Sequence, residues 1–203
     1  ILCSLPPYFE SYQNGSVNDE FKYFYNYIIN KMDTIIDKYI IETCISHLHI
    51  ETIIKLIQQK SQKKIIISIY PKGLITQKHI QYLIDNYDIY AILINCCDFQ
   101  TMKSYFFKNI YTLKMDNNIQ LGFYCNMLNE MSYNNCDNSK KKTNVCLQKY
   151  KNDKIITMND LDIFFKQYKK QNKLIIGGCC GYGTKELALL FNYLNFYNKK
   201  PYL

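Results

Sequence analysis

Six short runs of apolar residues, rich in β-branched side chains, recur along the chain and are separated by longer segments with helical spacing. The runs occupy residues 1–4, 39–43, 64–69, 90–95, 120–124 and 173–177. Most of them are continuous rather than alternating, which is typical of parallel strands that are buried on both faces. A strand and then a helix, repeating about every 25 to 30 residues, predict successive βα units and a parallel sheet.

The segments between the runs contain apolar residues three and four positions apart, so they predict helices. These are expected at about residues 18–37, 49–59, 76–86, 99–110, 159–170 and 184–197, with Thr184 as the N-cap of the last. The repeat fits a (β/α)8 TIM barrel, an α/β fold of roughly 250 residues, and it also fits a doubly wound open sheet. A polar interval at about 129–153 predicts a surface insertion in a single domain spanning residues 1–203.

The net charge of +8 comes entirely from lysines, because the sequence contains no arginine. The lysines are scattered, and sequence-specific readers of nucleic acid rely on arginine for bidentate contacts, so we expect no nucleic-acid partner. No run approaches the roughly 20 apolar residues of a membrane span, so we expect no membrane partner either. The nine cysteines, an odd number, indicate a soluble protein in a reducing, cytoplasmic compartment.

Cysteines gather after the predicted strands, where parallel βα folds place their chemistry. Cys179 and Cys180 stand together in Gly-Gly-Cys-Cys-Gly, and Cys96 follows the fourth run. Neighbours in a regular strand point to opposite faces, but flanking glycines permit a positive φ and a bend that turns both sulfurs inward. Three thiolates leave one tetrahedral position open, as in a catalytic zinc site. The competing interpretation is that these cysteines are small apolar side chains in a tight turn.

The segment Gly177-Gly178-Cys179-Cys180-Gly181 resembles the signature of the homocysteine S-methyltransferases. Other strand ends agree in order and spacing, and they are Ile41-Glu42-Thr43, Ile94-Asn95-Cys96 and Phe123-Tyr124-Cys125-Asn126, the last similar to a Tyr-Pro-Asn motif with Cys for Pro. The resemblance implies a (β/α)8 barrel with about the last six βα units present. The family's first two units, with an Asp-Gly-Gly motif, are then expected to lie outside the chain.

The resemblance also implies the chemistry. Cys96, Cys179 and Cys180 are expected to bind Zn2+, with the sulfur of homocysteine as the fourth ligand, and the product is methionine. Glu42 is expected to hold the ammonium group of homocysteine, while Asn95 and Asn126 orient the substrate or support the zinc loop. S-methylmethionine or S-adenosylmethionine is the favoured methyl donor, with betaine as an alternative. The partners are therefore small molecules, and the oligomeric state stays open.

A second hypothesis is a catalytically inactive barrel that serves as a zinc-binding or interaction module, because the strand-end motifs depart from the family pattern at several positions. Cys97 and Cys125 are expected to pack or to line the pocket, and Cys3 and Cys44 to lie near its mouth. Cys136 and Cys146 are expected in the insertion. The histidines, at positions 47, 49 and 79, are interpreted as surface residues away from the strand ends.

Overall fold

A computed structural model describes residues 1–9, 15–126, 156–168 and 172–198. Within them lies one sheet of parallel strands in the order β1-β2-β3-β4-β5-β6. The strands are β1 (Leu2–Leu5), β2 (Lys38–Cys44), β3 (Lys64–Ile69), β4 (Ile89–Asn95), β5 (Gln120–Cys125) and β6 (Leu174–Gly178). Each begins and ends within one or two residues of a predicted run.

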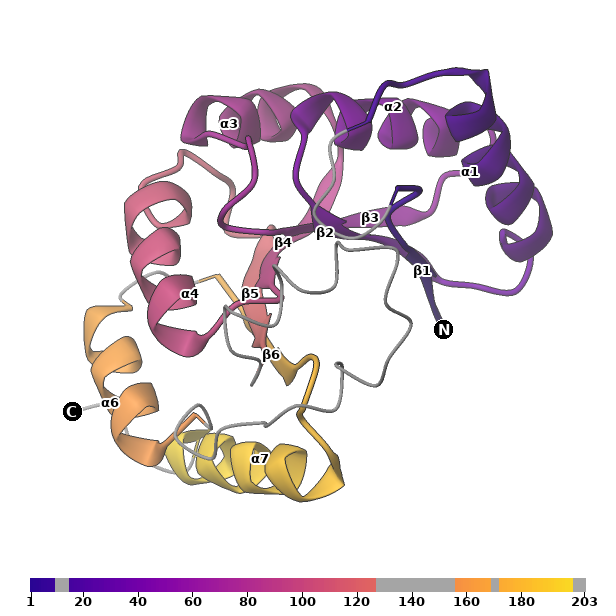
Figure 1. Cartoon of the computed structure of the whole chain (residues 1–203). Helices are drawn as coiled ribbons and strands as arrows, with labels where there is room; N and C mark the ends of the chain where they lie inside the picture. Colours follow the sequence, from indigo (N-terminus) through magenta and orange to yellow (C-terminus); the bar gives the residue numbers. More distant parts are fainter. Residues whose placement is uncertain (10–14, 127–155, 169–171, 199–203) are drawn as a thin grey trace, which may run out of the picture.

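The helices follow the strands in regular alternation. They are α1 (Asp19–Met32), α2 (His47–Gln58), α3 (Gln77–Asn86), α4 (Phe99–Tyr105), the π-helical turn η1 (Phe106–Ile110), α6 (Met158–Gln167) and α7 (Thr184–Asn198). Figure 1 shows them on the outside of the curved sheet, in an arc from α1 round to α7. The six parallel strands therefore form a half-barrel. A doubly wound sheet is excluded because its strand order reverses at a switch point, and this order does not.

Several helix ends are fixed by side chains. Asn18 accepts a hydrogen bond from the backbone N–H of Phe21, and Thr76 forms a capping box with His79. Thr184 is the first helical residue of α7 rather than its N-cap, so that prediction was wrong. Glu186 then occupies the third helical position and accepts a hydrogen bond from the N–H of Gly183 at 2.9 Å.

Two apolar layers pack on the two faces of the sheet. The outer core lies between the strands and the helices, and the inner core contains only strand residues, namely Ile40, Ile66, Ala91 and Leu93. Phe164 of α6 anchors the outer core near β5, because its ring lies 5.2 to 5.3 Å from those of Phe106 and Phe123. Among the described residues, no helix is long and apolar enough to cross a bilayer.

Alternation along the strands decides which side chains face the concave side. Leu93 of β4 belongs to the inner core, so Asn95, two residues later, also faces inward. The same spacing from Ile40 brings Glu42 to the concave face of β2. Since all strands run in one direction, their carboxyl ends form a single edge, and this edge carries the candidate site.

Candidate metal centre at the carboxyl edge of the sheet

Three sulfur atoms meet at the carboxyl edge. The Sγ atom of Cys96, at the end of β4, lies 3.2 Å from that of Cys179, which follows β6. The Sγ atoms of Cys179 and Cys180 are 3.8 Å apart. Cys96 is buried, Cys179 is half-buried and Cys180 is exposed. The sequence predicted these cysteines as a group, and in the structure they are close neighbours. Cys96 and Cys179 are nevertheless 83 residues apart in the chain.

Cys96 reaches the concave side because the chain leaves its strand conformation there. Its φ is 56°, in the left-handed region that residues other than glycine rarely adopt. In regular strand geometry Cys96 would point toward the helices, opposite to Asn95. The left-handed turn instead directs the sulfur toward β6.

The loop after β6 bends where glycine permits it. The N–H of Tyr182 donates to the carbonyl of Cys179 at 3.0 Å, which closes a four-residue turn. Gly181 is the third residue of that turn and has a φ of 88°, as a type II turn requires. At Gly178, a Cβ atom would stand 2.3 Å from the ring of Tyr182, so only glycine lets that ring close over the turn. The positive φ predicted for the flanking glycines is therefore found at Gly181, whereas Gly178 is needed for the space that it leaves to Tyr182.

The thiols influence one another electrostatically. Hydrogen bonds from Cys179 and Cys96 lower the pKa of Cys180 well below that of an ordinary thiol. Hydrogen bonding to Cys180 and Cys96, together with burial, raises the pKa of Cys179. One thiolate is thus stabilised by its neighbours, while a second negative charge is strongly opposed. A bound cation is what would allow all the sulfurs to be thiolates together.

The donor set fits zinc in type and nearly in spacing. Zinc–sulfur bonds of about 2.3 Å in a tetrahedron place two sulfurs roughly 3.8 Å apart. Cys179 and Cys180 already have that separation, whereas Cys96 and Cys179 are closer, at 3.2 Å. With side chains as they stand, no group of three His, Cys, Asp or Glu residues among the described parts of the chain has the arrangement of a finished metal site.

Glu42 lies at the same edge, next to Thr43, whose hydroxyl oxygen is 3.7 Å from Cys96 Sγ. Glu42 itself is half-buried. With Thr43 it also borders a small cavity of about 30 Å³, but most residues that line this cavity, among them Tyr25, Ile50 and Ile53, belong to the outer core. Burial raises the pKa of Tyr124, and the charge of Glu42 raises it further. The carboxylate of Glu42 therefore acts on the concave face rather than on bulk solvent alone.

The two predicted asparagines are both buried at this edge. The side-chain N–H groups of Asn95 donate to Thr43 Oγ1 at 2.9 Å and to Cys96 Sγ at 3.3 Å. Its Oδ1 atom receives no hydrogen bond from the described residues. Asn126 is 1% exposed, and its backbone N–H donates to the carbonyl of Cys97 at 2.9 Å. Asn95 thus contacts the sulfur cluster directly.

The remaining cysteines lie outside the cluster. Cys3, Cys44, Cys97 and Cys125 are buried in the outer core, and burial raises the pKa of each. Packing was the expectation for Cys97 and Cys125. Cys136 and Cys146 fall outside the described residues, as does the predicted insertion at about 129–153.

The histidines, interpreted as surface residues, are less exposed than that interpretation implies. All three are half-buried. The Nε2 atom of His49 is 2.7 Å from the carbonyl oxygen of Gly15, and its ring packs on Phe9 at 5.6 Å. The rings of His47 and His79 stack at 3.9 Å. These contacts join segments far apart in sequence, so helical position alone did not reveal them.

Thr43 ends the Ile41-Glu42-Thr43 motif, but the sequence assigned it no role in the site. It follows Glu42, is 8% exposed and has a φ of 50°. A β-branched residue is an outlier in this region of φ. Its hydroxyl oxygen lies 3.7 Å from Cys96 Sγ.

Fold and edge together define a class of protein: a parallel βα half-barrel with a thiol cluster where its strands end. The homocysteine S-methyltransferase family model matches residues 1–194, and the chain belongs to that family. A comparison with curated protein sequences finds no significant match.

Solved structures agree in fold. The apo form of the homocysteine methyltransferase MmuM from Escherichia coli is 17% identical with a TM-score of 0.61, and the match covers 95% of this chain and 62% of that one. The metallated form of the same enzyme is also 17% identical with a TM-score of 0.61, covering 92% of this chain and 58% of that one. The chain therefore spans less than two thirds of the length of the structures that it resembles.

Proposed function

We propose that this chain forms most of an enzyme that transfers a methyl group to the thiol of homocysteine and so produces methionine, with zinc held by Cys96, Cys179 and Cys180. The observation that carries the proposal is the meeting of three sulfurs from two strand ends, at 3.2 and 3.8 Å. Membership of the homocysteine S-methyltransferase family and the metallated form of a protein of similar fold support it.

The proposal includes a complete (β/α)8 barrel in a single domain. The described strands supply the concave wall, and the match to a longer protein of similar fold supports further βα units beside β1 and β6. An eight-stranded barrel has an interior filled with side chains and a rim made by the carboxyl ends of its strands. The polar residues at the described edge are then part of that rim.

The chemistry depends on converting a thiol into a nucleophile. A free thiol has a pKa of about 8.5 and is mostly protonated at neutral pH. Zinc, when bound, would replace that proton and keep the substrate sulfur nucleophilic at neutral pH. The three cysteines would leave one position for that sulfur, which attacks the donor's methyl carbon as the donor's own sulfur or nitrogen departs with the bonding electrons.

Residues beside the cluster would orient homocysteine. Glu42 is suited to its ammonium group, because a carboxylate accepts charge-assisted hydrogen bonds and the charge of this one acts on Tyr124 at the concave face. Asn95 would support the cluster through its contact with Cys96 and offer its buried Oδ1 atom to the substrate. Asn126, buried directly after β5, would orient the substrate or support the zinc loop at the same rim. Correct placement of the two reactants is the main contribution of such a site.

S-methylmethionine or S-adenosylmethionine is the donor that we propose, and the assay should compare both with betaine. Each donor would be supplied with homocysteine to the zinc-loaded full chain, and methionine would be measured by mass spectrometry. Methionine should form with a sulfonium donor, and Cys179→Ser should abolish it. Cys97→Ala is the matched control, because Cys97 adjoins Cys96 but packs in the outer core. Zinc binding without methionine from any donor would instead favour an inactive zinc-binding module.

A further inference from the structure

Thr43 holds an unfavourable backbone conformation at the edge of the sulfur cluster. Its φ of 50° is unfavourable for a β-branched residue, so the surroundings must hold it in place. Cys96, the residue nearest to its hydroxyl in the cluster, has a similar φ of 56°. Two left-handed, non-glycine residues, Thr43 of β2 and Cys96 directly after β4, therefore face each other on the concave side.

The hydrogen bonds around Thr43 have a definite direction once Cys96 is a thiolate. Asn95 Nδ2 donates to Thr43 Oγ1 at 2.9 Å, so the hydroxyl oxygen already acts as an acceptor. The hydroxyl proton can then be directed to Cys96 Sγ, 3.7 Å away. The same amide nitrogen of Asn95 donates its second N–H to that sulfur at 3.3 Å. When Cys96 is a thiolate it accepts from both neighbours, and it has no proton to return.

We propose that Thr43 is a positioning residue for Cys96: its hydroxyl, oriented by Asn95, donates to the sulfur and holds it in the rotamer that faces Cys179. The proposal rests on the proposed function, since it concerns a sulfur assigned to bind zinc. It adds a residue to which the family signature gave no role. Hydrogen bonds from outer residues fix the orientation of metal ligands and adjust their donor strength, and losing one typically lowers metal affinity by about 10- to 100-fold.

A purely space-filling role for Thr43 makes a different prediction. Val has nearly the shape of Thr and the same β-branching, but it lacks the hydroxyl and leaves an N–H of Asn95 without its acceptor. Ser keeps the hydroxyl but lacks the methyl group. If shape matters, Thr43→Val resembles the wild type and Thr43→Ser does not. If the hydroxyl matters, the order is reversed.

The test measures metal binding to the full chain by competition with a chromophoric chelator, for zinc and for cobalt(II). Thr43→Val should weaken zinc binding by roughly 10- to 100-fold, and Thr43→Ser by only a few-fold. The sulfur-to-cobalt charge-transfer band should shift in Thr43→Val and remain near its wild-type position in Thr43→Ser. Thermal unfolding of the metal-free variants checks the fold. If Thr43→Val does not fold, Thr43→Ala against Thr43→Ser gives the same comparison.

Equal zinc affinities and cobalt spectra for wild type and Thr43→Val would overturn the role of Thr43 and leave the proposed function standing. Tight zinc binding that depends on the hydroxyl, without methionine formation from any donor, would refute the proposed function alone. Absence of zinc binding in the wild-type chain would refute both.

Discussion

Gly122 is the position where one added methyl group should most directly disturb the site. It lies in β5, and a Cβ atom there would stand 2.0 Å from the carbonyl oxygen of Ile175 in β6 and 2.9 Å from Leu93 Cδ2. Ordinary carbon–oxygen contacts are about 3.3 Å or longer, so β6 would have to move by roughly 1.3 Å or bend. The obstacle is backbone, which cannot rotate away. Since β6 leads directly into Cys179, the displacement would reach the sulfur cluster.

Overpacking of this kind costs about 1 to 3 kcal/mol or more, which for a chain of this size lowers Tm by roughly 2 to 12 °C. Gly122→Ala should therefore melt earlier than wild type in circular dichroism without metal, and its zinc affinity should fall. Gly177→Ala is the matched control, because its Cβ would meet only Tyr124 Cβ at an ordinary 3.5 Å. Equal melting of the two variants would refute the close approach of β5 and β6.

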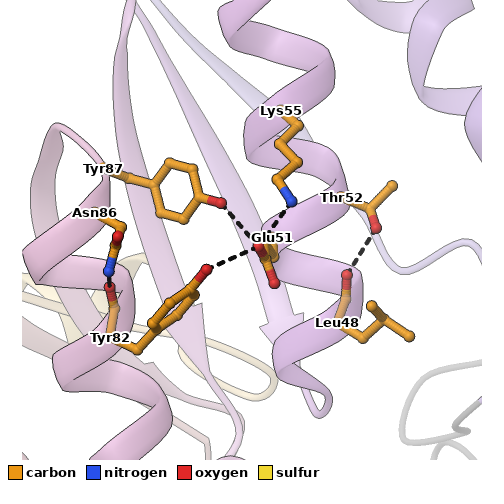
Figure 2. A network of polar contacts seen from close by, with 7 residues as sticks. All are labelled: Leu48, Glu51, Thr52, Lys55, Tyr82, Asn86 and Tyr87. Atoms are coloured by element: carbon orange, nitrogen blue, oxygen red, sulfur yellow. Dashed lines mark hydrogen bonds and ion pairs between the residues drawn. The ribbon is translucent and has the colours of Figure 1, made fainter.

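Two further predictions concern stability away from the sulfurs. Glu51 of α2 accepts hydrogen bonds from Lys55, Tyr82 and Tyr87, tying α2 to α3 (Figure 2). The bond from Lys55 lowers the pKa of Glu51, so this stabilisation is complete above about pH 4.3 and is lost as pH falls through the lowered pKa. Glu51→Gln should thus melt earlier than wild type at pH 7, with the difference in Tm shrinking as pH falls through the lowered pKa; a difference that is constant with pH would contradict this. Phe164→Ala should cost about 3 to 5 kcal/mol in chemical unfolding. Phe165→Ala, at the half-buried neighbour, is its control. An equal loss of stability in both variants would count against Phe164 as the aromatic anchor.

Most of the fold was predictable because each strand is a compact apolar run flanked by polar turns. Buried parallel strands need continuous apolar sequence, so β3 and β4 were predicted to within one residue at each end. The α-helix to π-helix change at Phe106 was not predictable, since the apolar spacing continues through it. The start of α7 was misplaced by one residue because both Gly183 and Thr184 are acceptable caps.

The grouping of the cysteines could be predicted from the sequence, but the backbone conformation that brings them together could not. The glycine at position 181 permits a positive φ, and the structure has one there. Cys96 and Thr43 also adopt a positive φ, although neither is glycine. Long-range packing imposes this conformation, and the local sequence does not indicate it. The role of Thr43 depends on Asn95, 52 residues away, and such a pairing follows only from strand register.

The central claim is that the three cysteines hold zinc and leave one position for the sulfur of homocysteine. X-ray absorption at the zinc edge, recorded on the full chain before and after adding homocysteine, tests it most directly. Three sulfur ligands at about 2.3 Å should become four on addition, and Cys180→Ser should lower both counts by one. A zinc environment with fewer than three sulfurs, or one that homocysteine leaves unchanged, would contradict the claim.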